Sequence, residues 1–255
     1  MHPPPTQYAT EDNLAARQRL WAISRYEPAF SLYPWVLGLA GLRGGEAVLE
    51  VGCGNGSYLE LVEAVGLDVS PGMVAAARQR ARGPLVAGDI VRLPIATSSF
   101  DVVLAAHMLY HVDDRATAAR EIRRALRPLG VFVAVTNGES NHREMVELVE
   151  EVVGNAWRWS RPSDAVFSLE NGADQLRVAF DQVDRVDCPP VVVTVTDADA
   201  LADYLASVGD HYAPQVAAWT TWDQVVDECR RRARRIIESR GGFRVSVSMG
   251  AFVCR

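Results

Sequence analysis

The stretch VLEVGCGNG at residues 48–56 decides the fold of this 255-residue chain. A short apolar run ends there in glycines at three alternate positions, and the residues that follow have a helical composition. Glycines let the backbone turn sharply and approach a ligand closely, and the start of a helix offers unpaired N–H groups. The stretch therefore predicts a buried strand, a tight turn and a ligand at a helix N-terminus, or else a glycine-rich turn without a ligand.

The residues around the turn indicate which ligand it would hold. A dinucleotide fingerprint has the spacing G-x-G-x-x-G, but here Gly56 comes one place early and Ser57 follows it. Glu50, two places before Gly52, would repel a pyrophosphate and suit an ammonium or sulfonium group. Asp68 ends the next apolar run, where a carboxylate can accept hydrogen bonds from both ribose hydroxyls. S-adenosylmethionine has a ribose and positive charge and needs no phosphate site, so it fits.

Outward from the turn, apolar runs alternate with stretches of helical spacing. This alternation predicts an α/β fold, with a doubly wound parallel sheet. The expected strands are 47–51, 64–68, 84–88, 101–106 and 131–136, and the expected helices between them are 57–64, 71–82 and 115–127.

The flanking segments predict further helices around one domain spanning residues 1–255. We expect a helical N-terminal lid at 1–40, a ligand-binding core at 41–136, and helical insertions on the acceptor side at 137–182 and 197–240. Within the first insertion, the pattern predicts a helix at 138–158 and a loop and helix at 162–180. The run 183–195 contains two prolines and predicts an edge strand or an irregular one. The run 243–254 predicts an alternating strand with a glycine bulge.

The segment 46–136 resembles the core of class I S-adenosylmethionine-dependent methyltransferases, in particular the bacterial small-molecule group. The matching pieces are EVGCGNG at 50–56, GLDVSPGM at 66–73, GDIVRLP at 88–94, SFDVV at 99–103 and LRPLG at 126–130. The resemblance implies a Rossmann-like, mostly parallel sheet of seven strands with helical lid insertions. Only nine residues separate Gly56 from Gly66, which implies a shortened first helix.

The resemblance also implies roles for individual residues. Backbone atoms of the turn, at Gly52, Cys53 and Gly54, would lie along the methionine part of S-adenosylmethionine, with Glu50 near its ammonium group. Asp68 would accept the ribose hydroxyls.

Further roles follow for the adenine and the sulfonium. Val69 and Met73 would flank the adenine, Asp89 would accept its amino group, and the Ile90 backbone would address the ring. Ala106 would lie beside the sulfonium at the end of its strand. Arg17 is a candidate partner of the cofactor carboxylate.

Two histidines are the candidate catalytic groups. His107 and His111 follow the fourth core strand and are four residues apart, so on a helical turn they would share a face. An imidazole has an ordinary pKa suited to a general base near neutral pH. Alternatively, one or both pack in the core or only form hydrogen bonds. No metal site is expected, since Asp113 and Asp114 more simply cap the following helix.

Composition narrows the possible functions. All 26 basic residues are arginine, and without lysine a Schiff-base enzyme or a P-loop NTPase is excluded. The net charge of −6 and the scattered cysteines predict a cytoplasmic protein that binds neither nucleic acid nor membrane. The arginine run at 230–235 lies among acidic residues and predicts a solvated helix face. The start of the chain lacks the pattern of a signal peptide.

These observations predict an enzyme that methylates a small molecule at oxygen, nitrogen or carbon and releases S-adenosylhomocysteine. We expect an apolar acceptor cavity walled by the 137–182 insertion, with aromatic residues at 157, 159, 167, 219 and 222 as candidate walls. Alternatively, these aromatic residues fill the core beneath the insertions. The alternatives are a regulatory or scaffold protein that binds S-adenosylmethionine without transfer, and a nicotinamide-dependent oxidoreductase. A monomer or a homodimer is expected.

Overall fold

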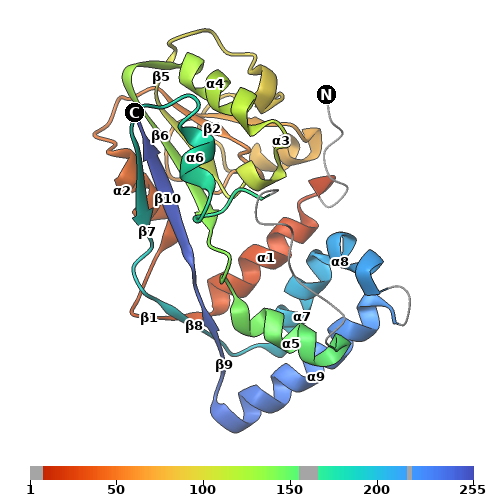
Figure 1. Ribbon diagram of the computed structural model, residues 1–255. Helices are drawn as coiled ribbons and strands as arrows, with labels where there is room; N and C mark the ends of the chain where they lie inside the picture. Colours follow the sequence, from red (N-terminus) through yellow and green to blue (C-terminus); the bar gives the residue numbers. More distant parts are fainter. Residues whose placement is uncertain (1–7, 155–165, 217–219) are drawn as a thin grey trace.

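A computed structural model describes residues 8–154, 166–216 and 220–255, and Figure 1 shows them in two lobes. One lobe contains a seven-stranded sheet with helices on both faces. The other contains most of the remaining helices and a three-stranded sheet. Helix α1 (Asp12–Ile23) runs along the junction between the lobes.

The large sheet has the order β4-β3-β2-β5-β6-β10-β7. Its strands are β2 (Val48–Val51), β3 (Val65–Asp68), β4 (Leu85–Ala87), β5 (Phe100–Ala106), β6 (Leu126–Asn137), β7 (Val183–Asp187) and β10 (Met249–Cys254). The five strands from β2 to β6 pair in parallel, whereas β10 is antiparallel to both of its neighbours. The predicted doubly wound, mostly parallel sheet of seven strands is confirmed.

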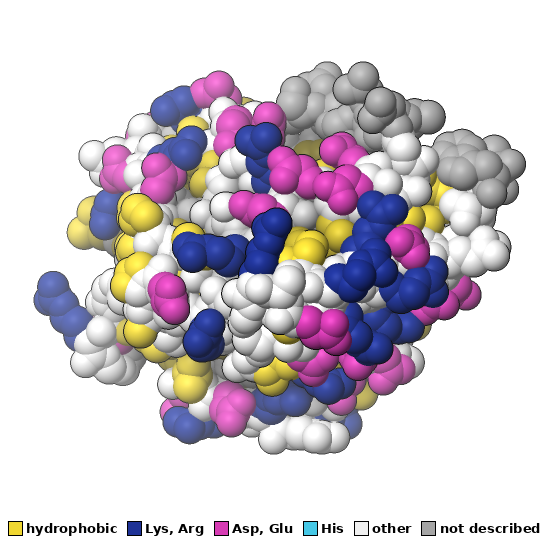
Figure 2. Space-filling model, turned by 90° about the horizontal axis from the view of Figure 1, so that it is seen from below, with side chains coloured by type: hydrophobic (Ala, Val, Ile, Leu, Met, Phe, Trp, Pro, Cys, Tyr) yellow, Lys and Arg dark blue, Asp and Glu magenta, His cyan; other side chains and the backbone are white. Residues whose placement is uncertain are grey.

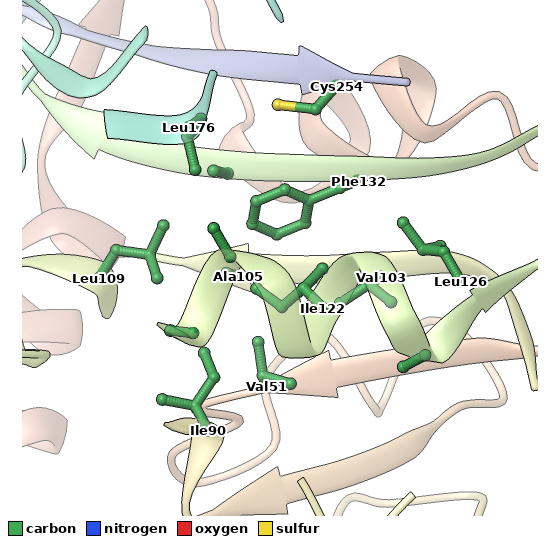
Figure 3. Packing of buried hydrophobic residues seen from close by; sticks show 14 of the residues in the cluster. Val51, Ile90, Val103, Ala105, Leu109, Ile122, Leu126, Phe132, Leu176 and Cys254 are labelled. Carbon is green, nitrogen blue, oxygen red and sulfur yellow. The ribbon is translucent and has the colours of Figure 1, made fainter. Parts of the chain in front are cut away.

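Helices cover both faces of this sheet, so both faces are buried. Successive strand residues point to opposite sides and therefore pack on different faces. Leu49 and Val51 pack on the face that carries α4 (Arg115–Ala125) and α6 (Gly172–Leu176). Figure 3 shows Phe132 in the middle of this cluster, with Ile122 from α4 beside it. Val48 packs on the opposite face, with α2 (Leu32–Ala40) and α3 (Pro71–Ala77).

Two helices that pack on the large sheet, α3 and α4, begin at side-chain caps. Ser70 accepts from the backbone N–H of Met73 at the start of α3. Asp114 accepts from the N–H of Thr117 at 3.0 Å and so caps α4, as predicted. Two short 3₁₀ helices, η2 (Ile90–Arg92) and η3 (Leu109–His111), follow strands β4 and β5.

The second lobe has its own hydrophobic core. Its antiparallel sheet has the order β1-β8-β9, formed by Arg25–Glu27, Val192–Val195 and Phe243–Ser246. Its helices are α5 (Arg143–Val153), α7 (Ala198–Ser207), α8 (Gly209–Val216) and α9 (Trp222–Arg240), and α1 packs against α7.

Two local predictions were wrong, and a third was right only in part. Residues 57–62 form hydrogen-bonded turns and no helix, because the connection to Gly66 is too short for a full one. The run 183–195 supplies β7, which is an edge strand of the large sheet as predicted, but it also supplies β8, in the middle of the small sheet. It is divided between the two sheets because Pro189 and Pro190 lack the N–H groups that a ladder needs.

The second wrong prediction is the glycine bulge in the run 243–254. The chain leaves the small sheet at Val247 and Ser248 and enters the large one as β10. Gly250 pairs regularly there, opposite Thr136 and Asp187. A side chain at Gly250 would lie 2.7 Å from the Val186 carbonyl oxygen, so this position requires a close backbone approach.

Candidate functional site

A cavity of about 1050 Å³ lies at the carboxyl ends of β2, β3, β4 and β5, where the two lobes meet. This is the edge at which ligands bind in open parallel sheets. Pockets for single small molecules have volumes of about 300–1,000 Å³, so this cavity has room for more than one ligand. Every residue predicted for the site lines it: Arg17, Glu50, Gly52, Cys53, Gly54, Asp68, Val69, Met73, Asp89, Ile90, Ala106, His107 and His111.

The glycine turn after β2 has a backbone that only glycine adopts readily. Gly52, Gly54 and Gly56 have φ values of +67°, +54° and +83°. A Cβ atom on Gly52 would lie 2.7 Å from Cγ of Met108, and one on Gly56 would lie 3.1 Å from Cβ of Ala77. The turn therefore depends on both the backbone freedom and the small size of glycine.

Glu50 is the most unusual polar residue of the cavity. Its side chain is 2% exposed, and its Oε2 atom has no hydrogen-bond partner among the residues that the structure describes. Burial raises the pKa of this carboxyl well above its ordinary value, and Asp68 raises it further. An acid in this state is suited to a cationic ligand that provides the missing donors.

Asp68, at the end of β3, holds the glycine turn in place. Its Oδ2 accepts from the N–H of Gly54 at 2.9 Å, and its Oδ1 accepts from the N–H of Ser70 at 2.8 Å. Burial nevertheless raises the pKa of Asp68. A carboxylate has about four acceptor positions, so two bonds to the backbone leave positions for a ligand.

Asp89 lies beside the same part of the cavity and also has a structural bond. Its Oδ1 accepts from the N–H of Val91 at 3.1 Å, which caps η2. Its predicted bond to adenine stays a prediction. Asp101, near the start of β5, does not line the cavity; it accepts from the N–H of Ala47 and from Arg127 and so has a structural role.

Tyr8 connects two of the predicted site residues. Nη1 of Arg17 donates to the Tyr8 hydroxyl at 2.8 Å, and the hydroxyl lies 3.0 Å from Nε2 of His111. Arg17 also donates from Nε to the hydroxyl of Ser207 at 3.0 Å. The Ser70 hydroxyl donates to the backbone oxygen of Tyr8 at 2.8 Å, so the N-terminal segment lies over the end of β3. Tyr8 lies within the lid predicted at residues 1–40, but nothing in the sequence indicates these hydrogen bonds.

His107 and His111 do not share a helical turn, contrary to the prediction. His107 has a φ of +55° at the end of β5, whereas His111 lies at the end of η3. Burial lowers the pKa of His107 to about 4, so its imidazole is neutral at neutral pH.

A third histidine, His142, was missed by the sequence analysis. It lines the same cavity, and burial and then His107 lower its pKa to about 3. Its ring stacks on Trp21 at a centroid distance of 4.4 Å, and Tyr204 contacts both rings edge-on. Its distance of 35 residues from His107 in the sequence gave no signal of this proximity.

The aromatic walls differ from those predicted. Phe167 and Trp222 are buried in the two hydrophobic cores, because Phe167 packs on Phe252 and Trp222 on Tyr212. The tryptophans at positions 157, 159 and 219 lie outside the described residues. The observed walls come from the N-terminal segment and the second lobe: Tyr8, Trp21, Tyr26, Phe30, Tyr33, Val191, Val193, Tyr204 and Val247.

The predicted insertion supplies little of the cavity. Within the described part of 137–182, only Asn137, Asn141 and His142 line it. The main reason is that α5 turns its apolar face into the core of the second lobe.

Other kinds of site find no support in the described residues. Among residues 8–154, 166–216 and 220–255, no group of three or more histidine, cysteine, aspartate or glutamate side chains is placed to hold a metal ion. Within the same ranges, no helix combines the length and apolarity needed to span a bilayer. The arginines of 230–235 form ion pairs with nearby acids, which fits the predicted solvated surface. Figure 2, the view from below, shows basic and acidic side chains intermixed on that face.

Residues 49–134 match the family model described as a methyltransferase domain. This part of the chain is therefore similar to a methyltransferase domain. The malonyl-[acyl-carrier protein] O-methyltransferase of Serratia marcescens is 30% identical over 125 residues, which is 47% of this chain and 49% of that protein. The demethylmenaquinone methyltransferase of Mycobacterium sp. (strain KMS) is 36% identical over 121 residues, 46% of this chain and 52% of that protein. The chain thus spans about half the length of the curated relatives it matches.

The likeness to a solved structure extends beyond the residues that the family model matches. The crystal structure of the YcgJ protein from Bacillus subtilis aligns with a TM-score of 0.54 and 15% identity, over 87% of this chain and 96% of that one. At this identity the likeness concerns the fold alone. It supports the seven-stranded architecture and leaves the acceptor open.

Proposed function

We propose that this protein binds S-adenosylmethionine at the glycine turn and transfers its methyl group to a small molecule in the same cavity. The observation that carries the proposal is the buried Oε2 atom of Glu50 beside the turn, which has no hydrogen-bond partner among the described residues. Burying a carboxyl without a partner is unfavourable, and a bound ammonium group would supply the missing donors.

The remaining cavity residues fit the other parts of such a ligand. Asp68 retains acceptor positions for ribose hydroxyls, and Asp89 retains them for an amino group. Val69, Met73 and Ile90 offer apolar contacts for adenine, and Ala106 leaves space at the end of β5. These assignments follow the class I resemblance and are part of the proposal.

When bound, S-adenosylmethionine supplies a methyl group on a positively charged sulfur, which an acceptor atom displaces in line. The protein's task is then to align the acceptor and exclude water. The N-terminal segment is placed for exclusion, because Tyr8 and Gln18 bond to residues beside the turn. Gln18 bonds to Asn55 and Ser57.

The bond between Tyr8 and His111 gives a route for a proton. Arg17 donates to the Tyr8 oxygen, and the Tyr8 hydroxyl can donate to Nε2 of His111 in the tautomer whose Nε2 carries no hydrogen. An acceptor that loses a proton can pass it to this pair. His107 is the weaker candidate base, since burial lowers its pKa to about 4.

An enclosed small molecule fits the acceptor half of the cavity. Its wall combines aromatic rings such as Trp21 and Tyr204 with a few polar groups, the usual composition of a small-molecule site. The arginines of α9, which would have been the candidate contact for a nucleic acid, are paired with acids on the surface.

Calorimetric titration tests the binding step. Wild-type protein should bind S-adenosylmethionine and S-adenosylhomocysteine and show no affinity for NADH. Asp68→Ala should weaken binding by about tenfold or more, since it removes charge-assisted bonds of about 1.5–3 kcal/mol. Binding of NADH alone, or unchanged affinity in Asp68→Ala, would contradict the proposal. Transfer is then tested with radiolabelled S-adenosylmethionine and a panel of small-molecule acceptors.

A further inference from the structure

A second buried polar atom without a partner lies in the same cavity. The Tyr58 side chain lines the cavity and is 5% exposed, and its hydroxyl has no hydrogen-bond partner among the described residues. Tyr58 follows the glycine turn by two residues, and its ring meets Tyr33 edge-on at a centroid distance of 4.7 Å. Buried tyrosine hydroxyls usually have a partner, so this one requires an explanation.

Tyr58 and Glu50 flank the glycine turn in the sequence and line the same cavity. The pKa of the Tyr58 phenol is raised, first by burial and then by the Glu50 carboxyl. Both side chains line the cavity, yet neither orphan atom finds a partner in the part of the chain that the structure describes, so they do not bond to each other. A ligand group with several N–H donors, placed between the two oxygens, would satisfy both at once.

An ammonium group has the required donors. It carries three N–H bonds and a positive charge, so one N–H can be donated to Oε2 of Glu50 and another to the hydroxyl oxygen of Tyr58. A neutral amide would meet the hydroxyl but would leave the buried carboxyl without an opposite charge.

We infer that Tyr58 is a binding residue that holds, together with Glu50, the ammonium group of the amino-acid end of the cofactor. This inference rests on the proposed function. It adds a ligand contact that neither the glycine motif nor the family comparison assigns, and it explains why a polar tyrosine is buried where a phenylalanine would pack equally well.

The test compares two ligands in Tyr58→Phe, which removes only the hydroxyl oxygen. S-adenosylhomocysteine carries the amino-acid end, whereas 5′-methylthioadenosine has the same nucleoside and thioether without it. By calorimetry, Tyr58→Phe should lose about ten- to a hundredfold in affinity for S-adenosylhomocysteine, as expected for a bond to a charged group. Its affinity for 5′-methylthioadenosine should stay within about twofold of wild type. Tyr212→Phe, which alters a buried tyrosine in the core of the second lobe that does not line the cavity, is the control and should leave both affinities unchanged.

Thermal unfolding without ligand gives a second readout. Because the Tyr58 hydroxyl has no partner in the described residues, its removal should leave the melting temperature unchanged or raise it. Equal losses for both ligands, a lowered melting temperature, or unchanged binding of S-adenosylhomocysteine would each overturn the inference while the proposed function stands. A wild-type protein that binds neither ligand would overturn the proposed function and this inference together.

Discussion

Replacing Glu50 with glutamine should change stability and cofactor affinity in opposite directions. Burial and Asp68 raise the pKa of Glu50 above its ordinary value of 4.5, so the folded protein holds this proton more tightly than the unfolded chain. The free energy of unfolding of the wild type therefore falls as the pH rises from the pKa of Glu50 in the unfolded chain toward its higher pKa in the folded protein. Glu50→Gln does not ionise and escapes this loss. The ligand-free variant should be more stable than wild type at about pH 8 and equally stable near about pH 4.

The affinity should fall because the ligand loses a charged partner. A hydrogen bond between charged groups contributes about 1.5–3 kcal/mol, which corresponds to about ten- to a hundredfold in affinity. Among the described residues, none forms a hydrogen bond with Oε2 of Glu50, so no protein group is already positioned there to replace the lost carboxylate. Wild-type binding should also release a proton from Glu50, so its affinity for S-adenosylhomocysteine should rise with pH, and this dependence should be weaker in Glu50→Gln.

Calorimetry provides both measurements. Titrations at about pH 6 and about pH 8 give affinity and proton release, and thermal scans without ligand give stability; for a chain of this size, about 1 kcal/mol shifts the melting temperature by about 2–4 °C. Glu60→Gln, on the same segment but exposed, is the control and should change neither quantity. A Glu50→Gln protein that binds S-adenosylhomocysteine as tightly as wild type would refute the reasoning.

Three further outcomes follow from the structure. Gly38→Ala, in α2, should stabilise the protein by about 0.5–1 kcal/mol in thermal scans, since the added Cβ meets nothing within 4 Å; a lower melting temperature would contradict this. Gly52→Ala should cost more than about 1 kcal/mol and abolish tight binding of S-adenosylhomocysteine, because the φ of +67° and Met108 both oppose a side chain; intact binding by calorimetry would show that the turn is not needed. Acidification below about pH 6.5 should destabilise the ligand-free protein, because His107 and His142, with lowered pKa values of about 4 and about 3, take up protons on unfolding. Asparagine is the replacement of choice, because His107 and His142 both have a left-handed backbone, which asparagine tolerates. Denaturant titrations of His107→Asn and His142→Asn should show a smaller pH dependence of the free energy of unfolding. An unchanged pH dependence would contradict burial of the histidines as the cause.

The core of the fold was predictable because its signals are local. Each parallel strand is a short apolar run, and the glycine turn and Asp68 mark where strands end. The small sheet was not predictable in this way. Its strands β1, β8 and β9 come from three distant segments, and β9 is continuous in pattern with β10 although the two belong to different sheets. Which sheet a strand joins depends on tertiary packing, which overrides local pattern.

In the candidate site, too, some residues are marked by local sequence signals and others are placed only by tertiary packing. The residues at the strand ends, such as Glu50 and Asp68, were predictable, since the ends of parallel strands share one edge of the sheet. The opposite wall was not: His142 and Tyr204 reach the cavity from α5 and α7, and nothing in their sequence context distinguishes them from core residues. The hydroxyl of Tyr58 is likewise visible only as an unpartnered atom in the folded chain.

A crystal structure of the protein with S-adenosylhomocysteine would test the central proposal most directly. The ligand should occupy the cavity between the lobes, with its amino group at Glu50, its ribose hydroxyls at Asp68 and its sulfur facing the chamber lined by Trp21 and Tyr204. A ligand bound elsewhere, or bound with its amino group away from Glu50 so that the buried carboxyl stays unpaired, would contradict the account.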